Sequence, residues 1–166
     1  LPELPPLYMD MTVKEYLDFV AELKKLEKSL RAGYVKEAMK ITKTEEVSGR
    51  LIRNLSKGYR QRVGFAQAVL GYPEILILDE PTVGLDPKQI IEIRDLIKEL
   101  GKKHTIILSS HILSEISAVC DHVFIISHGK LVASDSTENL LERMTGAQEI
   151  ELLVKAEEDT AETAIR

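Results

Sequence analysis

The chain has 166 residues, of which 44% are apolar and 30% charged, and its formal net charge is −5. A chain of this length can form one sizeable globular core, and the absence of a basic block argues against a nucleic-acid-binding surface. No apolar run approaches the roughly 20 residues that span a bilayer. The single cysteine, Cys120, cannot form an internal disulfide, and we expect it to be a buried, small apolar residue.

The first eight residues contain three prolines, Pro2, Pro5 and Pro6, which predict an extended loop. A helix is expected to follow, because Thr12 and Glu15 form a capping box and apolar residues then recur at helical spacing. A second helix is predicted from about residue 35 to about residue 46. The basic residues between these helices, from Lys24 to Arg31, are interpreted as a solvated face.

A third helix is predicted to begin after Ser56, whose hydroxyl is suited to the N-cap position. Gly58 allows this helix to start close to another backbone or to a phosphate. The first N–H groups of a helix are unpaired and the helix dipole is positive there, so a hydroxyl at this position favours anion binding.

A run of four apolar residues, 75–78, ends in Asp79 and Glu80. Such a run predicts a strand buried on both faces, as in a parallel sheet covered by helices. Two acids at the carboxyl end of this strand would lie where open α/β sheets bind ligands. One can hold a divalent cation through water, and its neighbour can take a proton from a water nucleophile. These features together predict that the ligand is a nucleotide.

The chain then turns through Gly84 to Asp86, which with Pro87 can begin a helix. This helix is expected to end at Gly101 as a C-terminal cap. Residues 105–109 predict a second buried strand, and His111 follows it, at the same edge of the sheet as the two acids. A further helix is predicted over residues 112–119.

The remaining segments carry no motif. Residues 123–126 predict a third buried strand, which forms a hairpin with residues 130–133 at the edge of the sheet. A short helix is expected around Leu140 to Met144, ended by Gly146, and residues 149–154 alternate like an exposed strand.

Two motifs, LSKGYRQR at residues 55–62 and ILILDEPTVGLD at residues 75–86, resemble the ATP-binding subunit of an ABC transporter. They are most similar to the export-type branch, whose signature often reads LSKGY, and the resemblance extends from the first residue to about Ser136. It implies an α/β fold: a partial P-loop NTPase (ABC ATPase) domain with a mostly parallel sheet flanked by helices, plus a helical subdomain.

The resemblance implies a role for each residue at the end of the strands, with ATP and Mg²⁺ as cofactors. Asp79 would hold Mg²⁺ through water, and Glu80 would be the general base that deprotonates the attacking water. His111 would be the switch histidine, which contacts the γ-phosphate and holds the water.

Other residues are implied to act across a dimer interface. Ser56, Lys57 and Gly58 would bind the γ-phosphate of ATP held by a second ATPase subunit, and Asp86 would cross the interface and couple the two sites. The helical subdomain would dock a transmembrane permease subunit. The implied location is cytoplasmic, peripheral on the inner face of the cell membrane, with membrane contact only through the permease and no nucleic-acid partner.

The sequence departs from the family in two ways. Leu4 occupies a position where the family has a glutamine that reaches the metal and the attacking water, and no G-x-x-x-x-G-K-[ST] phosphate loop is present. We therefore expect a piece of a longer protein that is inactive on its own. The expected division is residues 1–72, glutamine loop and helical subdomain; 73–146, the carboxyl-terminal part of the ATPase core; and 147–166, the start of an accessory segment.

Two functions remain open from the sequence. The first is an ATPase subunit that powers export across a membrane. The alternative is a non-catalytic ABC-like interaction module, which Leu4 and the missing phosphate loop favour but Asp79, Glu80 and His111 do not. A soluble ABC-type ATPase of translation or DNA repair is less favoured, because the sequence has no long coiled-coil or duplicated insertion.

Overall fold

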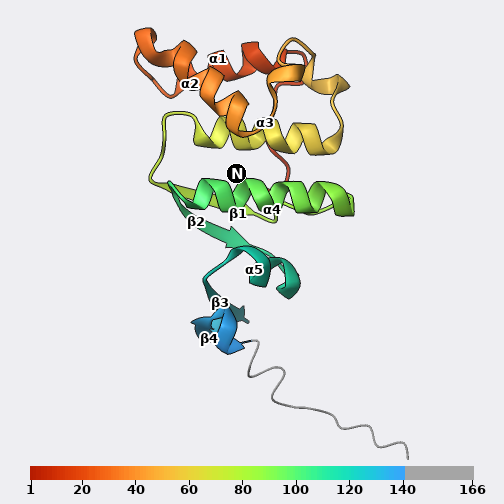
Figure 1. Ribbon diagram of the computed structural model, residues 1–166, viewed down its shortest axis with the longest axis vertical. Coiled ribbons are helices and arrows are strands. Elements are labelled where there is room, and N and C mark those ends of the chain that lie inside the picture. The colour runs from red at the N-terminus through yellow and green to blue at the C-terminus, as the bar shows by residue number, and fades with distance from the viewer. Residues whose placement is uncertain (141–166) are drawn as a thin grey trace, which may run out of the picture. The chain divides into compact units, whose positions relative to one another are not determined.

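Figure 1 shows the structure of the chain, a computed structural model that describes residues 1–140. The chain divides into one unit that spans Leu1–Cys120 and a second that begins at Asp121. The predicted boundaries after residues 72 and 146 stay predictions. Among the described residues, none of the helices has the length and apolarity that crossing a bilayer requires.

Helix α1, Val13–Leu23, begins with the predicted capping box. Thr12 Oγ1 accepts from the backbone N–H of Glu15 at 3.3 Å, and the Glu15 carboxylate accepts from the backbone N–H of Thr12 at 2.8 Å. These bonds satisfy N–H groups that have no partner within the helix. The buried face of α1 consists of Val13, Tyr16, Leu17, Val20 and Ala21.

Helix α2 spans Lys28–Ile41, so it begins and ends earlier than predicted. Its buried residues, Val35, Ala38 and Met39, lie in its second half, which is why no apolar periodicity marked the first half. Thr42 caps the carboxyl end, where its hydroxyl donates to the carbonyl of Ala38 at 2.8 Å. The short 3₁₀ helices η1, Glu45–Val47, and η2, Ile52–Asn54, follow.

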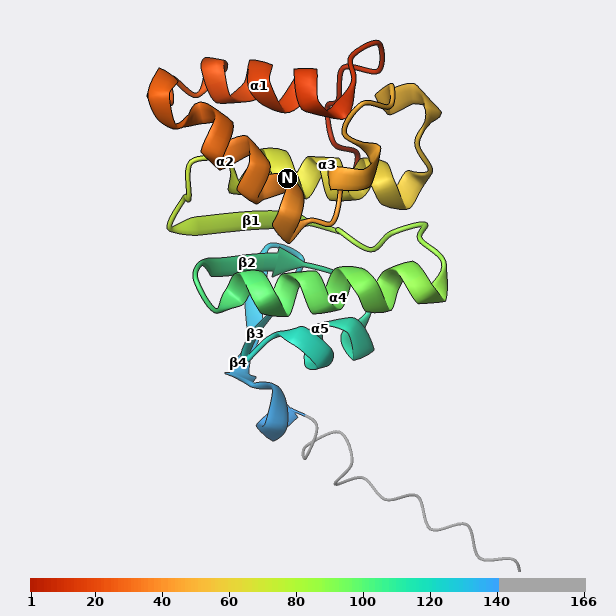
Figure 2. The same cartoon turned by 45° about the horizontal axis from the view of Figure 1, so that its top comes forward.

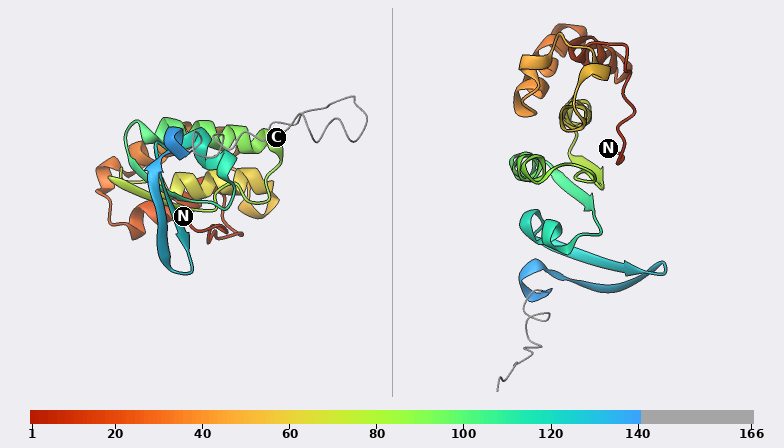
Figure 3. Two further views of the ribbon diagram at one scale, coloured as in Figure 1. Left: turned by 90° about the horizontal axis from the view of Figure 1, so that it is seen from below. Right: turned by 90° about the vertical axis from the view of Figure 1, so that its right-hand side faces the viewer.

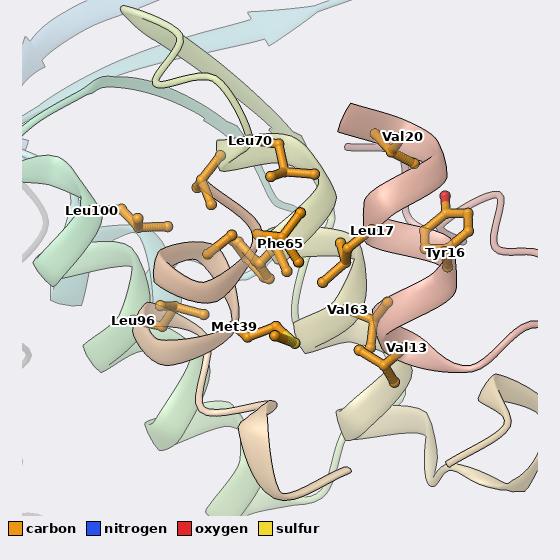
Figure 4. Packing of buried hydrophobic residues seen from close by; sticks show 14 of the residues in the cluster. Val13, Tyr16, Leu17, Val20, Met39, Val63, Phe65, Leu70, Leu96 and Leu100 are labelled. Atoms are coloured by element: carbon orange, nitrogen blue, oxygen red, sulfur yellow. The ribbon is translucent and has the colours of Figure 1, made fainter. Parts of the chain in front are cut away.

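Helix α3, Lys57–Val69, is N-capped by Ser56 as predicted and packs against α1 and α2. Figure 4 shows the core that these helices share with α4: Val63 and Phe65 of α3 meet Leu17 of α1, with Met39 of α2 and Leu96 of α4 close by. Phe65 and Leu17 are fully buried. This apolar core holds the start of α3 in a fixed place relative to α4.

Lys24 is exposed, as expected for a solvated face, and it also caps the other end of α3. Its Nζ donates to the carbonyls of Gln67 at 2.8 Å and Leu70 at 2.9 Å. These carbonyls have no partner within the helix, and a cation favours the negative end of the helix dipole. Burial lowers the pKa of Lys24.

Strands β1, Ile75–Asp79, and β2, Thr105–Ser109, form a parallel pair in which Asp79 lies opposite Ser109. They are connected by helix α4, Pro87–Gly101, and β2 leads into helix α5, Leu113–Val119. The backbone of Leu1 lies beside β1, since its carbonyl accepts from the N–H of Asp79 at 2.9 Å. Figures 2 and 3 show α4 and α5 next to each other, on the same side of the two strands.

The predicted burial of β1 on both faces is wrong. Leu76 and Leu78 are buried, but Ile75 and Ile77 are 55% and 62% exposed. Strand β2 is half-buried in the same way, with Ile107 54% exposed. Alternate side chains of a strand point to opposite faces, and within residues 1–120 the helices α4 and α5 cover only one of them.

Two smaller expectations in this unit are also wrong. Gly101 is the last residue of α4 rather than a cap beyond it, and Lys102 caps the helix with a right-handed backbone conformation. Cys120 is partly exposed instead of buried.

The second unit contains the predicted hairpin, in which β3, His122–Ser127, pairs antiparallel with β4, Lys130–Ser136. The turn at His128 and Gly129 has φ values of 48° and 72°, as tight hairpin turns require. The predicted burial of β3 is wrong, because Phe124 and Ile126 are 63% and 70% exposed. The expected strand at 149–154, and the helix around 140–144 beyond its first residue, lie outside the described residues.

Candidate functional site

The two acids lie at the carboxyl end of β1, beside the carboxyl end of β2. Ser109, opposite Asp79 in the register, donates from Oγ to Asp79 Oδ1 at 2.6 Å. The backbone N–H of Glu80 lies within hydrogen-bond distance of the Ser109 carbonyl, at 3.2 Å, and of its hydroxyl, at 3.1 Å. Ser109 therefore orients both acids, although the sequence marked it only as a strand end.

Glu80 has a φ of 45°, in the left-handed region that residues with a side chain rarely adopt. Such backbone conformations cluster at functional sites, where the surrounding structure enforces them. The conformation turns the chain out of β1 at once, and Glu80 Oε1 lies 2.8 Å from His111 Nδ1. The other carboxylate oxygen, Oε2, is buried and has no hydrogen-bond partner within the described residues.

His111 follows β2 by two positions and faces solvent, with its side chain 69% exposed. The hydrogen bond to Glu80, and then the charge of Glu80, raise the pKa of His111. When Nδ1 donates to the carboxylate, Nε2 is free to contact a further group. Together, Glu80 and His111 can hold a water molecule and accept a proton from it.

Asp79 is the residue suited to a cation. No group of three or more His, Cys, Asp or Glu side chains that could enclose a metal occurs among residues 1–140. A closed protein cage is not what Mg²⁺ needs, because this ion usually keeps several waters and is held by one or two carboxylates plus phosphate oxygens. Asp79, with one oxygen held by Ser109 and with its side chain exposed, fits that mode.

The start of α3 forms a separate region with the start of α4. Ser56 Oγ accepts from the N–H of Tyr59 at 3.3 Å, and Asp86 Oδ1 accepts from the N–H of Gln89 at 2.9 Å, so each residue caps its helix. Ser56, Gly58 and Asp86 line one hollow of about 630 Å³. A Cβ atom on Gly58 would lie 2.7 Å from Cδ of Gln89, so a larger residue there would require the Gln89 side chain to move.

Lys57 lies next to the turn that precedes α4. Gly84 in that turn has a φ of 68°, and a Cβ atom added to it would collide with Lys57 Nζ. The predicted residues therefore fall into two groups. Asp79, Glu80 and His111 gather at the strand ends, while Ser56, Lys57, Gly58 and Asp86 gather at the starts of α3 and α4. Their roles remain predictions.

An ion pair that the sequence did not indicate joins α3 to α4 at the wall of the hollow. Arg62 donates to Glu92 Oε2 at 2.6 Å and to the carbonyl of Thr42 at 3.2 Å. Its side chain is only 11% exposed. In the sequence Arg62 is only the last residue of the LSKGYRQR motif, directly before Val63, and this position gives no sign of a partner on another helix.

Comparisons with known proteins agree with one another. A family model described as "ABC transporter" matches residues 1–83, which is half of the chain. The bacitracin transport ATP-binding protein BcrA of Bacillus licheniformis is 42% identical over 143 residues, which make up 85% of this chain and 46% of BcrA. The ABC transporter ATP-binding protein YxlF of Bacillus subtilis is 37% identical over 131 residues, 79% of this chain and 44% of YxlF.

A solved structure shares the fold. CbiO1 of Clostridium perfringens, described as part of the ABC transporter complex cbiONQ, superposes with a TM-score of 0.76 at 29% identity. The match covers 87% of this chain and 60% of CbiO1. Of the two relatives BcrA and YxlF, the chain spans less than half the length of each.

Proposed function

Because this chain belongs to the ABC transporter family, we propose that it is part of an ATPase subunit that binds and hydrolyses ATP to drive export across a membrane. The observation that carries the proposal is the contact between Glu80 and His111 at the carboxyl ends of two adjacent parallel strands. That is the edge at which open α/β sheets bind ligands. The similarity to BcrA, a bacitracin transport protein, favours the export branch.

In the proposed mechanism, Glu80 is the general base. Its buried Oε2 has no partner among the described residues, so it can accept a proton from a water molecule. His111, held at Nδ1 by Glu80, presents Nε2 to the same water and to the γ-phosphate. Phosphoryl transfer depends mainly on positioning and charge neutralisation, so these residues need only hold and deprotonate the nucleophile. Mg²⁺ bound through Asp79 would neutralise charge on the phosphates.

The second group of residues serves a second ATPase subunit in this proposal. Ser56, Lys57 and Gly58 at the start of α3, with Asp86 at the start of α4, would contact ATP bound by that subunit. Two helix starts and a lysine form an environment that favours a phosphate. Their separation from the strand-end residues agrees with a site completed across a dimer interface.

A transmembrane permease is the second proposed partner, and the subunit would lie on the cytoplasmic side of the membrane against it. This proposal is supported by the similarity to CbiO1, which is described as part of an ABC transporter complex. The glutamine that senses the permease in the family is replaced here by Leu4, which is 72% exposed and cannot coordinate a metal.

The test is an ATPase assay on the complete gene product. We expect Mg²⁺-dependent hydrolysis that falls about 10²- to 10⁴-fold in Glu80→Gln, the usual range for losing a general base. Glu74→Gln is the matched control, since Glu74 is exposed just before β1 and should leave the rate unchanged. Equal rates for Glu80→Gln and the unmodified protein would refute the role of Glu80.

The 166-residue chain alone is expected to show no turnover, because its sequence lacks a phosphate loop. Turnover in this chain that disappears in Glu80→Gln would contradict that expectation. Leu4 favours the alternative of a non-catalytic interaction module. A complete gene product that binds its permease but hydrolyses no ATP would support that alternative.

A further inference from the structure

Two hydrogen bonds join the same two segments at the strand ends. The outer bond links Glu80 to His111. The inner one runs from the hydroxyl of Thr82, two positions after Glu80, to the carboxylate of Glu115, one helical turn after His111. The two bonds differ in burial, because His111 is exposed whereas Thr82 and Glu115 are each only 6% exposed.

Because it is buried, the inner bond is the one that can fix the relative position of the two segments. The bond between Glu80 and His111 is open to water on the side of the histidine, whose side chain is 69% exposed, so it contributes less to holding its partners in place. A buried carboxylate that loses a donor keeps the full cost of its desolvation, so its hydrogen bond strongly favours one arrangement. Glu115 Oε1 also lies 3.9 Å from Nη2 of Arg94. Glu115 therefore joins α5 to α4 and to the turn after β1.

Besides the bonds of Glu115, helix α5 is held by apolar packing, since Ile116 is buried and Val119 packs against the core. The helix is only seven residues long, and Ile112 at its N-cap makes no side-chain capping bond. Helices of this length are not stable alone and depend on tertiary contacts. Glu115 lies in its first turn, where its backbone N–H donates to the carbonyl of Ile112 at 3.0 Å. A constraint on Glu115 thus passes directly to the residue that follows His111.

We propose that Thr82 and Glu115 are positioning residues, which hold the segment bearing His111 at the distance where its Nδ1 meets the carboxylate of Glu80. Neither touches the reacting atoms in this proposal. The catalytic consequence rests on the proposed ATPase function, because only there does the orientation of His111 matter. The geometric statement can be tested on the chain itself without any nucleotide.

The readout is the tautomer of the His111 ring, from ¹⁵N chemical shifts at a pH well above its pKa. A neutral imidazole whose Nδ1 donates to a carboxylate carries its proton on Nδ1. We expect this tautomer to predominate in the unmodified chain. Glu80→Ala provides the reference, which is the Nδ1–H fraction of His111 in the absence of the contact. Thr82→Val, which keeps the shape but removes the donor, should lower the Nδ1–H fraction by at least half. Thr82→Ser should restore it.

The matched control is Thr42→Val, which removes a fully buried threonine hydroxyl at the end of α2, and it should leave His111 unchanged. Glu115→Gln is a second variant, which keeps the volume but loses the carboxylate facing Arg94; we expect a smaller shift in the same direction. The wild-type tautomer in folded Thr82→Val or in folded Glu115→Gln would overturn the proposal.

Failure to fold also decides the matter. If both variants unfold while Thr82→Ser folds, the two residues serve stability alone and the proposal is wrong. An inactive gene product with the expected tautomer shifts would refute the ATPase function and leave the positioning role standing. An active gene product in which the variants leave the His111 tautomer unchanged would support the ATPase function and refute the positioning role.

Discussion

The hydrogen bond between His111 and Glu80 affects the protonation of the histidine. The Glu80 hydrogen bond and charge raise the pKa of His111, and the more distant carboxylates of Glu115 and Glu3 add to this, while partial desolvation opposes it. Because the pKa is raised in the folded state, the stability that this pair contributes is fully present below the unfolded pKa of about 6.5. It is lost as the pH rises through the folded value.

Replacing Glu80 with Gln should lower the pKa of His111 toward its ordinary value, because an amide carries no charge. The measurement is an NMR titration of the His111 Cε1 proton in the 166-residue chain. Glu74→Gln again serves as the control, because its carboxylate is not among the groups that act on His111. An unchanged midpoint in Glu80→Gln would show that the contact does not form in solution.

Single residues also show where sequence reasoning succeeds and fails. Asp79, Glu80 and His111 were predicted to share one sheet edge because they follow consecutive parallel strands, and the structure brings Glu80 and His111 into contact. Ser109 and Glu115 were missed, since their partners come from strand register and from tertiary packing. A serine that ends a strand and a glutamate within a short helix carry no local signal of such partners.

Among the elements, α3 and α4 are coupled where the candidate phosphate-contacting residues begin. Arg62 of α3 binds Glu92 of α4 and the buried carbonyl of Thr42, while Gly58 lies against Gln89. This coupling keeps Ser56 and Asp86 on the wall of the same hollow. A change in the position of one helix start is therefore transmitted to the other.

Arg62→Met should destabilise the chain by about 1–2 kcal/mol, because the carbonyl of the fully buried Thr42 loses a donor and Glu92 loses its counterion. Arg53→Met is the matched control. Arg53 pairs with Asp10 at 2.8 Å, but both side chains are more than half exposed, so its loss should cost less than about 0.5 kcal/mol. Urea denaturation measures the free energy of unfolding of both variants. If Arg62→Met and Arg53→Met lower it equally, burial does not determine how strongly these ion pairs stabilise the chain.

Element boundaries were predictable where side chains cap the helix. The start of α1 at Thr12, of α3 at Ser56 and of α4 at Asp86 each follows from a hydroxyl or carboxylate that accepts a backbone N–H. The start of α2 was placed too late because Glu27 at its N-cap makes no side-chain capping bond. Apolar periodicity marks only the buried half of such a helix.

For the molecule as a whole, the motifs predicted the family correctly, and periodicity predicted most of the helices and strands. The pattern did not predict which sheet faces are covered. Four consecutive apolar residues fit a strand with helices on both sides, yet Ile75 and Ile77 face solvent in the unit that contains them. The local sequence shows that a residue is apolar, but whether another element covers its side chain depends on the tertiary structure.

The exposed isoleucines have a consequence for the isolated chain. Ile75 and Ile77 of β1 and Ile107 of β2 occupy one face of a two-stranded sheet, and contiguous exposed apolar surface promotes association. We expect the 166-residue chain to associate with increasing concentration, and Ile77→Thr with Ile107→Thr to reduce that association several-fold by light scattering. Ile91→Thr on α4 is the control, because Ile91 is similarly exposed, at 58%, but lies on a helix. A chain that stays monomeric at high concentration, or an equal effect of Ile91→Thr, would show that this sheet face does not drive association.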